Sequence, residues 1–498
     1  MPDRPSLPPD LTTALFTADA VRHIDRAAIE RCGVAGFEIM QRAADAVFAT
    51  LRERWPDARR IAVLAGRGNN GGDALLVGKL ALEHGFDVDA YAVTHAPAGD
   101  AAAARHAFTK AGGRVHVLDA RVDLASADVV VDGLFGTGLA RPIEGDLAAL
   151  IEHVNASGKP ALAIDIPSGL SSDSGLRLGV AIRAQATVSL VAWKRGLFTG
   201  DAADCAGERE LAPLDVPDTA FDGISPDAQL LGGASMRALP KRCGNVNKGH
   251  FGHVLAIGGD FGMGGAVRLA AEAALRCGAG LVSVATRGAH VPALLAGRPE
   301  LMVRGVEEAA SIDDLIARAT VVAVGPGLGR ATWGAWLFES ALGSQRPLVV
   351  DADALNLLAA SPQTVHDAVL TPHPGEAARL LNTSTAEIQR DRFAAAQQLQ
   401  QRYGGAVVLK GAGTLVATAA GISVASYGNP GMASGGMGDV LSGVLGGLLA
   451  QHLDVAAAAQ FGVCVHGHAA DLAAAADGER GLLASDLLPH LRRLVNHE

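Results

Sequence analysis

The chain has 498 residues, of which 49% are hydrophobic and 19% are charged, and its formal net charge is −10. This length exceeds what one ordinary hydrophobic core supports, so we expect two domains, and the apolar content excludes a disordered chain. A negative net charge without a run of Lys and Arg argues against nucleic-acid binding.

The five cysteines form no CxxC pair. This usage is typical of a reducing compartment and argues against a disulfide framework and a zinc site. The first residues, MPDRPSLPPDLTTALF, lack an apolar segment of signal-peptide length, and the most apolar run, at 441–465, is interrupted by His452, Asp454 and glycines. We therefore expect a soluble, cytoplasmic protein that binds no membrane.

In the first half, apolar residues recur at helical spacing over residues 17–54, and Gly33 and Gly36 divide this segment into two helices. Strands and helices then alternate. The predicted strands are 61–65, 88–93, 115–118, 129–132 and 161–166, and the predicted helices are 74–84, 98–111 and 147–155, with a glycine loop before the first of them. This alternation predicts a doubly wound, mostly parallel sheet with sites at the carboxyl ends of its strands.

The segment 211–239 contains three prolines in APLDVPDTAFDGISPDA and has weak periodicity, so it marks a domain edge. We place the first domain at residues 1–215, a linker at 216–234 and the second domain at 235–498. The second series has predicted strands at 254–257, 281–285, 321–324, 348–350 and 406–409 and helices at 266–276, 440–451 and 456–475. Both domains are therefore expected to be α/β and doubly wound.

The loop GRGNNGGD follows the first predicted strand and matches the GxGxxG dinucleotide fingerprint, with Asp87 or Asp89 about 20 residues on. However, Asp73 at the start of the next helix would repel a pyrophosphate, and Asn69 and Asn70 offer oxygens that suit a hard cation. Asp132, the loop GTGLARP and the motif DIPSG add oxygens at the same sheet edge. The alternative is that these are turn and capping residues.

With the N-terminal helix pair, the motifs GRGNNGGD, VDGLFGTG and DIPSG resemble the NAD(P)H-hydrate epimerase domain, which is Rossmann-like, over residues 17–213. The resemblance implies that two loops line the hydrated nicotinamide nucleotide, through Asn69, Asn70, Gly71, Gly72, Asp73, Gly136, Thr137, Gly138, Leu139, Ala140, Arg141 and Pro142. It also implies that Asp165 contacts the substrate, and we select Asp165 for acid/base work at the C6 centre. A potassium ion would be held by Asn70, Asp132 and Ser168. The family loop continues NNGGDG where this chain has Ala74, a departure that affects the fine geometry of the loop.

In the second half, the stretch NPGMASGGMGDVLSG from Asn429 to Gly443 leads into an apolar helix. Glycines at a helix start leave backbone N–H groups free to bind an anion such as a phosphate. The negative charge of Asp439 would repel an anion bound there. We therefore favour a role for Asp439 as the proton acceptor for a hydroxyl group that attacks phosphorus. The alternative is a glycine-rich turn with Asp439 as an N-cap.

Other loops of this half carry polar groups. If the predicted strand at 348–350 continues through VVDADAL, Asp351 and Asp353 lie on the same face of that strand. The alternative is that they are a carboxylate at the strand end and a helix cap. The turn TPHPGE contains His373. No second histidine lies at the spacing of a metal-ligand pair, so we expect His373 to form hydrogen bonds and not to bind a metal. LKGAGT follows a predicted strand and is a plausible nucleotide cradle with one fixed charge.

The combination of a GxGD loop with a TPxxxE turn resembles the ribokinase-like fold. Within that group, the chain resembles the ADP/ATP-dependent NAD(P)H-hydrate dehydratase over residues 235–490, through the motifs KGxxGxxLxIGGD, GPGLG, VVDADAL, TPHPGE, LKGAGT and NPGMASGGMGDVLSG. The resemblance implies that the hydrate is bound by Ala266, Gly327, His373 and Asp439. The adenine nucleotide would be bound by Lys410, Gly411, Ala412, Gly413, Thr414 and Gly438. Glu376 would orient a magnesium ion through water.

Together the resemblances imply a bifunctional repair enzyme that epimerises the R and S hydrates of NADH and NADPH and dehydrates the S hydrate. ADP or ATP would be the co-substrate, with AMP and phosphate as products from ADP, and K⁺ and Mg²⁺ would be the metal cofactors. We expect a homo-oligomer. One alternative is a ribokinase-like kinase for a small molecule such as a vitamin precursor, with a nucleotide-binding regulatory N-terminal domain. A second is an N-terminal half that only binds a nucleotide or a protein partner.

Overall fold

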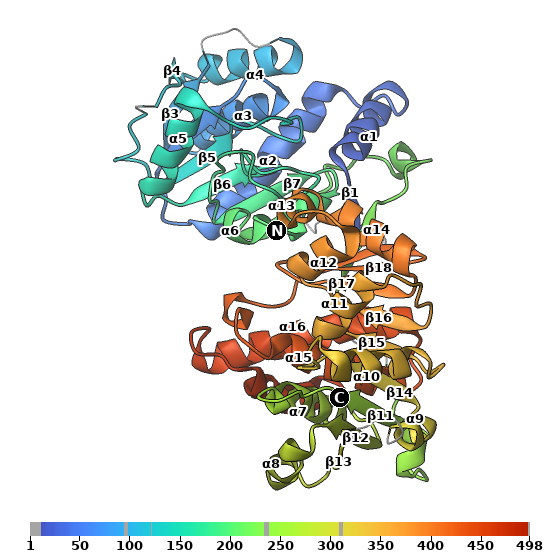
Figure 1. Ribbon diagram of the computed structural model, residues 1–498. Helices are drawn as coiled ribbons and strands as arrows, with labels where there is room; N and C mark the ends of the chain where they lie inside the picture. Colours follow the sequence, from blue (N-terminus) through green and yellow to red (C-terminus); the bar gives the residue numbers. More distant parts are fainter. Residues whose placement is uncertain (1–10, 94–97, 121, 234–238, 308–311, 497–498) are drawn as a thin grey trace. The chain divides into compact units, whose positions relative to one another are not determined.

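The computed structural model describes residues 11–93, 98–120, 122–233, 239–307 and 312–496. The chain divides into two compact units, Met1–Gln229 and Leu230–Glu498 (Figure 1). Within the expected linker lie a 3₁₀ helix, Asp218–Phe221, and the strand β10, Ala228–Leu231. Residue 234 of that linker and residues 235–238 of the expected second domain lie outside the described residues.

Unit 1 alternates strands and helices over most of its length. Its strands are β1 (Ala14–Phe16), β2 (Arg60–Ala65), β3 (Asp87–Ala92), β4 (Val115–Val117), β5 (Val129–Gly133), β6 (Ala161–Ile164), β7 (Ala186–Leu190), β8 (Trp193–Lys194) and β9 (Glu208–Ala212). Its helices are α1 (Ala18–Glu30), α2 (Gly36–Arg54), α3 (Asn69–Glu83), α4 (Gly99–Lys110), α5 (Gly145–Ala156) and α6 (Ala202–Cys205).

The main sheet of unit 1 has the order β4-β3-β2-β5-β6-β7-β9, and every neighbouring pair is parallel. From β2 the chain winds outward through β3 and β4, and it then returns to β5 on the other side of β2. This reversal makes the carboxyl ends of β2 and β5 a topological switch point, the position at which doubly wound sheets bind ligands. Outside this seven-stranded sheet, β1 forms a parallel pair with β8 and an antiparallel pair with β10.

Alternation along β2 explains why both faces of this sheet are covered. Ile61 and Val63 belong to one buried cluster, together with residues of α1, α2 and α3. Ala62 and Leu64 belong to a second cluster, together with residues of α5. Since successive side chains of a strand point to opposite faces, a nearly continuous apolar run is what a parallel sheet between two helical layers requires.

Unit 2 is also doubly wound. Its strands are β11 (His253–Ile257), β12 (Leu281–Thr286), β13 (Met302–Gly305), β14 (Val321–Val324), β15 (Leu348–Val350), β16 (Ala368–Leu370), β17 (Ala406–Leu409), β18 (Thr414–Thr418) and β19 (Gly421–Ala425). Its helices are α7 (Gly264–Arg276), α8 (Val291–Gly297), α9 (Asp313–Arg318), α10 (Thr332–Leu342), α11 (Ala352–Ala360), α12 (Pro374–Leu381), α13 (Thr385–Arg390), α14 (Arg392–Tyr403), α15 (Met437–Ala450), α16 (Val455–Asp477) and α17 (Leu487–Leu494).

The strands of unit 2 follow the order β13-β12-β11-β14-β15-β16-β17-β18-β19. Pairs from β13 to β17 are parallel, and β17, β18 and β19 form an antiparallel edge. The switch point lies between β11 and β14. The predicted fold class, α/β with two doubly wound domains, is therefore confirmed.

Helices α7 and α15 approach each other closely in unit 2. A side chain at Gly443 would collide with the carbonyl oxygen of Ala270, and a Cβ at Gly447 would lie 2.8 Å from the carbonyl oxygen of Ala274. Glycine is therefore required at both positions, although it costs about 1 kcal/mol in an ordinary helix interior.

Several helices begin earlier than predicted, and the difference is largest for two of them. Helix α3 begins at Asn69, not Ala74, and α15 begins at Met437, not Val440. The glycines that suggested a loop in NNGGD serve close packing: a side chain at Gly71 would collide with the backbone of Gly66. As a result Asn70, Gly438 and Asp439 lie in the first turns of helices, and Asp73 follows just after the first turn of α3.

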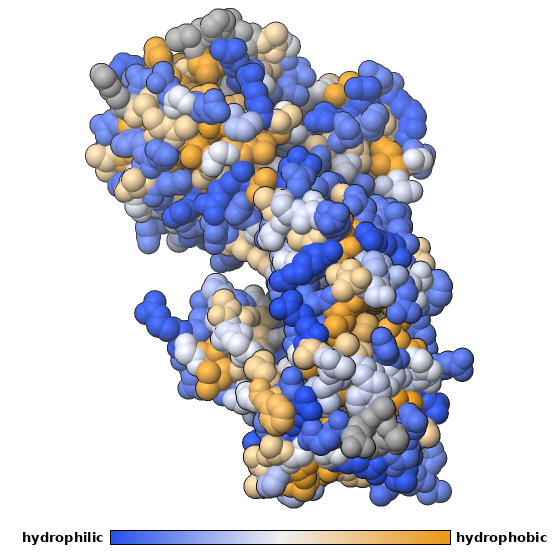
Figure 2. All heavy atoms as spheres, viewed as in Figure 1, coloured by the Kyte–Doolittle hydropathy of each residue, from blue (hydrophilic) through white to orange (hydrophobic). Residues whose placement is uncertain are grey.

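Among the described residues, no helix is both long and apolar enough to cross a membrane. On the face that Figure 2 shows, hydrophilic residues are interspersed with smaller apolar areas.

Candidate active sites

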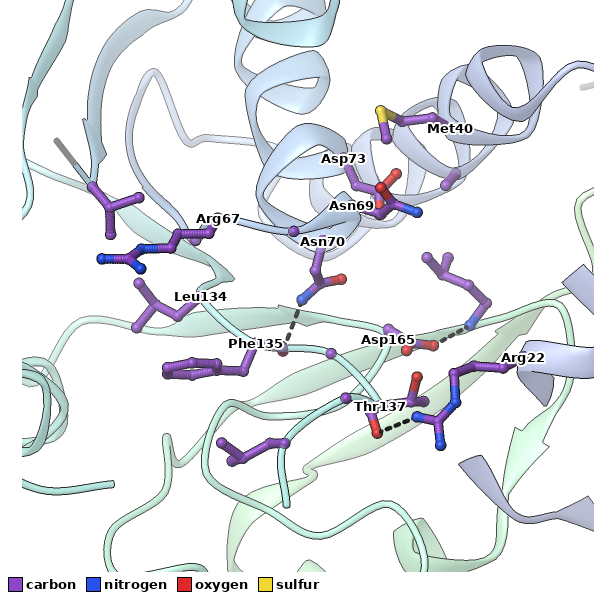
Figure 3. Close-up of a pocket in the computed structure, with 18 of the residues that line it drawn as sticks. Arg22, Met40, Arg67, Asn69, Asn70, Asp73, Leu134, Phe135, Thr137 and Asp165 are labelled. Carbon is purple, nitrogen blue, oxygen red and sulfur yellow. Dashed lines mark hydrogen bonds between the residues drawn. The ribbon is translucent and has the colours of Figure 1, made fainter. Parts of the chain in front are cut away.

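A cavity of about 1020 Å³ opens in unit 1 where β2, β5 and β6 end. Most residues of the two predicted loops line it, as Figure 3 shows in part: Asn69, Asn70, Asp73, Gly136, Thr137, Gly138, Leu139, Arg141 and Pro142, together with Asp165. Gly71, Gly72 and Ala140 are not among the lining residues. A Cβ at Gly72 would lie 2.8 Å from the sulfur of Met40, so this glycine is needed for packing.

Beneath the cavity, three predicted potassium ligands lie together. Asp132 is fully buried, and its two carboxylate oxygens accept hydrogen bonds from Ser168 Oγ (2.6 Å) and Ser168 N (2.8 Å). Asn70 Nδ2 donates to the carbonyl oxygens of Phe135 (2.8 Å) and Ile164 (3.1 Å). Burial raises the pKa of Asp132 to about 6, although the hydrogen bonds from Ser168 lower it. The group is rich in oxygen and carries one formal charge.

Asp165 is held in a strained position by a buried lysine. Its φ of 70° lies in the left-handed region, which costs a non-glycine residue about 1–3 kcal/mol. Lys194, which is fully buried, donates to Asp165 Oδ1, to the carbonyl oxygen of Leu190 (2.6 Å) and to Ser189 Oγ (3.3 Å). These acceptors use all three N–H bonds of the ammonium group, so the surrounding contacts fix the Asp165 side chain.

Two further carboxyl groups line the same cavity. Burial, followed by the charges of Asp165 and Asp25, raises the pKa of Asp73 well above its usual range. Burial also raises the pKa of Asp25 to about 6, with Lys194 opposing and Asp165 reinforcing the shift. Oδ1 of Asp25 is shielded from solvent and has no hydrogen-bond partner among the described residues.

Sequence reasoning missed Asp25 and Lys194. A single lysine at the end of the apolar run ATVSLVAW was the available signal for Lys194. Asp25 adjoins the buried face of its helix, next to Ile24 and Ala28, and this position was the corresponding signal.

In unit 2, Asp351 connects the predicted nucleotide loop to α15. It is buried, and its carboxylate accepts from Lys410 Nζ (2.8 Å) and from Ser442 Oγ (2.7 Å). Burial acts to raise the pKa of Asp351, but Lys410 and the hydrogen bonds together bring it below its usual value. Of the two interpretations of VVDADAL, the shared strand face is excluded, because β15 ends at Val350. The alternative agrees with the structure in placing both carboxylates at the strand end and the helix start: Asp351 takes the N-cap position of α11, and Asp353 lies in its first turn.

Asp439 lies close to this group, in the first turn of α15, and Gly436, with a φ of 91°, takes the N-cap position. Asp439 is therefore not the N-cap. Burial, reinforced by the negative charge of Asp351 and opposed by Lys410, raises the pKa of Asp439 to about 7. A Cβ at Gly438 would lie 3.3 Å from Lys410 Nζ, so these two predicted nucleotide contacts are neighbours.

His373 and Glu376 form a capping box at the start of α12. His373 Nδ1 accepts from Gly375 N (3.0 Å), and Glu376 Oε2 accepts from His373 N (2.8 Å). Glu376 lies 3.9 Å from Lys410 Nζ. Burial raises its pKa to about 7, against the charge of Lys410. The predicted turn therefore lies beside the nucleotide loop.

Two other features shape the site of unit 2. Gly327 has a φ of 60°, and a Cβ there would lie 3.3 Å from Cβ of Ala266, so these two predicted substrate contacts adjoin. Arg392, which sequence reasoning missed, is buried and donates to the carbonyl oxygens of Leu409 (3.2 Å) and Gly413 (3.4 Å). It therefore fixes the backbone of the loop Lys410–Thr414 from beneath.

A family model described as NAD(P)H-hydrate dehydratase matches residues 254–493, and one described as YjeF-related protein N-terminus matches residues 36–196. The chain is 47% identical to the bifunctional NAD(P)H-hydrate repair enzyme of Coxiella burnetii, over 97% of this chain and 100% of that protein. The chain belongs to the bifunctional NAD(P)H-hydrate repair enzyme family. Another member of this repair enzyme family, from Escherichia coli, is 44% identical over 99% of this chain and 96% of its own length.

Among solved structures, a ribokinase-like superfamily protein from Enterococcus faecalis is 30% identical with a TM-score of 0.51. The match covers 53% of this chain and 94% of that protein. The ribokinase-like fold predicted for part of this repair enzyme family member is thus confirmed.

Proposed function

We propose that this chain repairs hydrated NADH and NADPH by two activities, an epimerase in unit 1 and a nucleotide-dependent dehydratase in unit 2. The observation that carries the proposal is the match to bifunctional repair enzymes over nearly the whole chain. Each unit also has its own group of buried carboxylates, as two separate reactions would require.

In unit 1 the hydrate occupies the cavity lined by Asn69, Asp73, Gly136–Pro142 and Asp165. Asn70, Asp132 and Ser168 hold a potassium ion, together with neighbouring carbonyl oxygens. The donor set fits this ion because it offers several neutral oxygens and one carboxylate, whereas a divalent ion favours more charge. When bound, the ion would supply a fixed positive charge beside these three residues.

In unit 2 the hydrate contacts Ala266, Gly327, His373 and Asp439, and the adenine nucleotide contacts Gly438 and the loop Lys410–Thr414. Asp439 takes the proton from the C6 hydroxyl as its oxygen attacks the terminal phosphorus of the nucleotide. The bond between the terminal phosphorus and the bridging oxygen breaks as the new bond forms, so ADP departs as AMP. The C6–O bond then breaks with release of phosphate, and C5 loses a proton to water, which forms the C5=C6 double bond of NAD(P)H. Hydroxide leaves carbon poorly, so conversion to a phosphate ester supplies the better leaving group.

The residues of unit 2 also fit a magnesium ion bound through the nucleotide. Mg²⁺ commonly uses one or two carboxylates plus substrate phosphates and waters, and Glu376 beside Lys410 offers such a carboxylate. When bound, the ion neutralises charge on the transferring phosphate.

The experiment is NMR or chiral chromatography of an R/S hydrate mixture incubated with the whole chain, with and without ADP or ATP. We expect faster interconversion of the epimers without nucleotide, and loss of both epimers to NAD(P)H with nucleotide. A phosphorylated product that persists would instead identify a small-molecule kinase. Interconversion at the uncatalysed rate would contradict the epimerase activity and identify a domain that only binds.

A further inference from the structure

The carboxyl groups that line the cavity of unit 1 differ in their partners. Asp165 is paired with the buried ammonium group of Lys194 and also accepts from Leu190 N (3.2 Å) through the same oxygen, Oδ1. Asp25 also lines the cavity, yet its Oδ1 is shielded from solvent and has no hydrogen-bond partner among the described residues. An unsatisfied buried oxygen is costly and calls for an explanation such as a catalytic role.

The partners of Asp165 occupy one of its two oxygens. Oδ1 accepts from Lys194 and from Leu190 N, so the side chain supplies the counter-charge of a buried ammonium group, and loss of such a counter-charge is strongly unfavourable. The other oxygen, Oδ2, lies on the side of Gly136, where a Cβ would be 3.5 Å away from it. Oδ2 is thus positioned to accept a hydrogen bond from a bound hydrate while the carboxylate stays charged.

Asp25 has properties that suit a proton carrier. Of the charged groups that line the cavity, Lys194, Asp165 and Asp73 interact electrostatically with Asp25, and Arg22 lies on its own helix. The other charged residues of the lining are Arg67, Asp100, Asp119, Arg141, Glu144 and Asp146. Burial raises the pKa of Asp25 to about 6, and a carboxyl group that titrates near neutral pH both accepts and returns a proton readily.

We propose that Asp25 moves the proton during epimerisation, and that Lys194 holds Asp165 as a fixed, charged acceptor for the hydrate. This inference rests on the epimerase function proposed for unit 1. It transfers the acid/base role from Asp165, where the sequence suggested it, to Asp25, and makes Lys194 a positioning residue.

The chemistry needs only one proton carrier. In the hydrate, C6 bears a hydroxyl group and is bonded to the ring nitrogen N1, as in a hemiaminal. Asp25 takes the proton of the hydroxyl group while the C6=O bond forms and the C6–N1 bond breaks. The electron pair of the broken C6–N1 bond goes to N1, and N1 then receives the proton from Asp25. Rotation about C5–C6 presents the other face of the carbonyl, and the reverse steps close the ring in the opposite configuration. No electron or proton is gained or lost overall.

The test compares Asp25→Asn, Asp25→Glu and wild type in the whole chain. The assay follows a sample enriched in one epimer toward equilibrium without nucleotide, and the uncatalysed rate is subtracted. We expect Asp25→Asn to lower kcat by about 10²- to 10⁴-fold with little change in KM, and Asp25→Glu to recover part of the loss. Glu30→Gln is the matched control, because Glu30 is exposed at the end of the same helix and is not among the residues that line the cavity.

The pH profile provides a second readout that a purely structural role would not change. For wild type, kcat/KM should fall on the acid side with an apparent pKa of about 6, as Asp25 becomes protonated. This acid limb should be absent from the residual activity of Asp25→Asn. A wild-type profile without the limb would overturn the inference even if the Asn variant did not fold.

Two further outcomes separate this inference from the proposed function. Wild type that accelerates epimerisation while Asp25→Asn retains its rate and its acid limb would overturn the inference alone. Wild type that does not accelerate epimerisation would overturn the function of unit 1 and the inference with it.

Discussion

Replacement of Asp439 by Asn should make unit 2 more stable and nearly inactive. Burial raises the pKa of this carboxyl from 3.8 to about 7 in the folded protein. A shift of about 3 units at 1.36 kcal/mol per unit corresponds to a penalty of up to about 4 kcal/mol for the ionised group. The folded state binds the proton of Asp439 more tightly than the unfolded state does. The penalty is therefore absent below about pH 4, grows between about pH 4 and pH 7, and reaches its full value above about pH 7. Asp439→Asn removes it.

We therefore expect the free energy of unfolding to rise by up to about 4 kcal/mol at about pH 8 and to stay unchanged near pH 4. Loss of a general base should at the same time lower kcat for dehydration by about 10²- to 10⁴-fold, or roughly 3–5 kcal/mol of barrier. In wild type, kcat/KM for dehydration should fall on the acid side of about pH 7 as Asp439 becomes protonated.

Native-state hydrogen exchange of the amides of α15 measures the stability of the relevant segment in the whole chain. Epimerisation by unit 1 should be unaffected, and Asp477→Asn, at an exposed position at the end of α16, serves as the matched control. A variant that keeps more than about a third of its dehydration rate would show that Asp439 is not the base. Unchanged exchange of α15 at pH 8 would show that the buried charge carries no penalty.

Three further predictions concern the ions and the boundary between the units. A fragment that begins near Gly233 should fold and dehydrate the S hydrate alone; a well-folded but inactive fragment would contradict the independence of that site. Crystals soaked in rubidium should show an anomalous-scattering peak beside Asn70, Asp132 and Ser168, and a map without this peak would remove the potassium site. Lys410→Met should destabilise unit 2 by about 3–5 kcal/mol, because it leaves the Asp351 carboxylate buried without its charged partner, and it should also weaken nucleotide binding. Denaturant unfolding measures the first effect and nucleotide titration the second. An unchanged unfolding midpoint would contradict the importance of this ion pair.

Hydrophobic runs predicted β2 to β6 in unit 1 and β11, β12, β14, β15 and β17 in unit 2, and they missed β7, β9, β13, β16, β18 and β19. Val321–Val324, Leu348–Val350 and Ala406–Leu409 have the predicted bounds, because short apolar runs between turn residues specify a strand buried on both faces. The starts of α3 and α15 were predicted too late. Glycine has low helix propensity, and only the tertiary structure reveals that Gly71 lies against Gly66.

The candidate sites were predicted unevenly for a related reason. Motifs bring Asn70, Asp132 and Ser168 to one sheet edge, since Asp132 lies near the end of β5, Ser168 lies in the loop after β6, and Asn70 lies at the start of the helix that follows β2. Lys194 and Asp25 belong to no such motif and reach the cavity through β8 and α1, respectively. Their role depends on burial and pairing, which a local pattern of residues does not encode.

The close contact between α7 and α15 has a consequence for how substrates meet in unit 2. Ala266 belongs to α7 and Asp439 to α15, and the two helices are in contact at Gly443 and Gly447 with no room for a side chain between them. Sliding of one helix past the other would require the backbone to pass through carbonyl oxygens. The groups proposed to bind the hydrate and to accept its proton therefore lie on two helices that are already held in contact, so no binding energy is consumed in bringing these helices together. Movements that accompany the proposed reaction are then expected in the loops around the two helices.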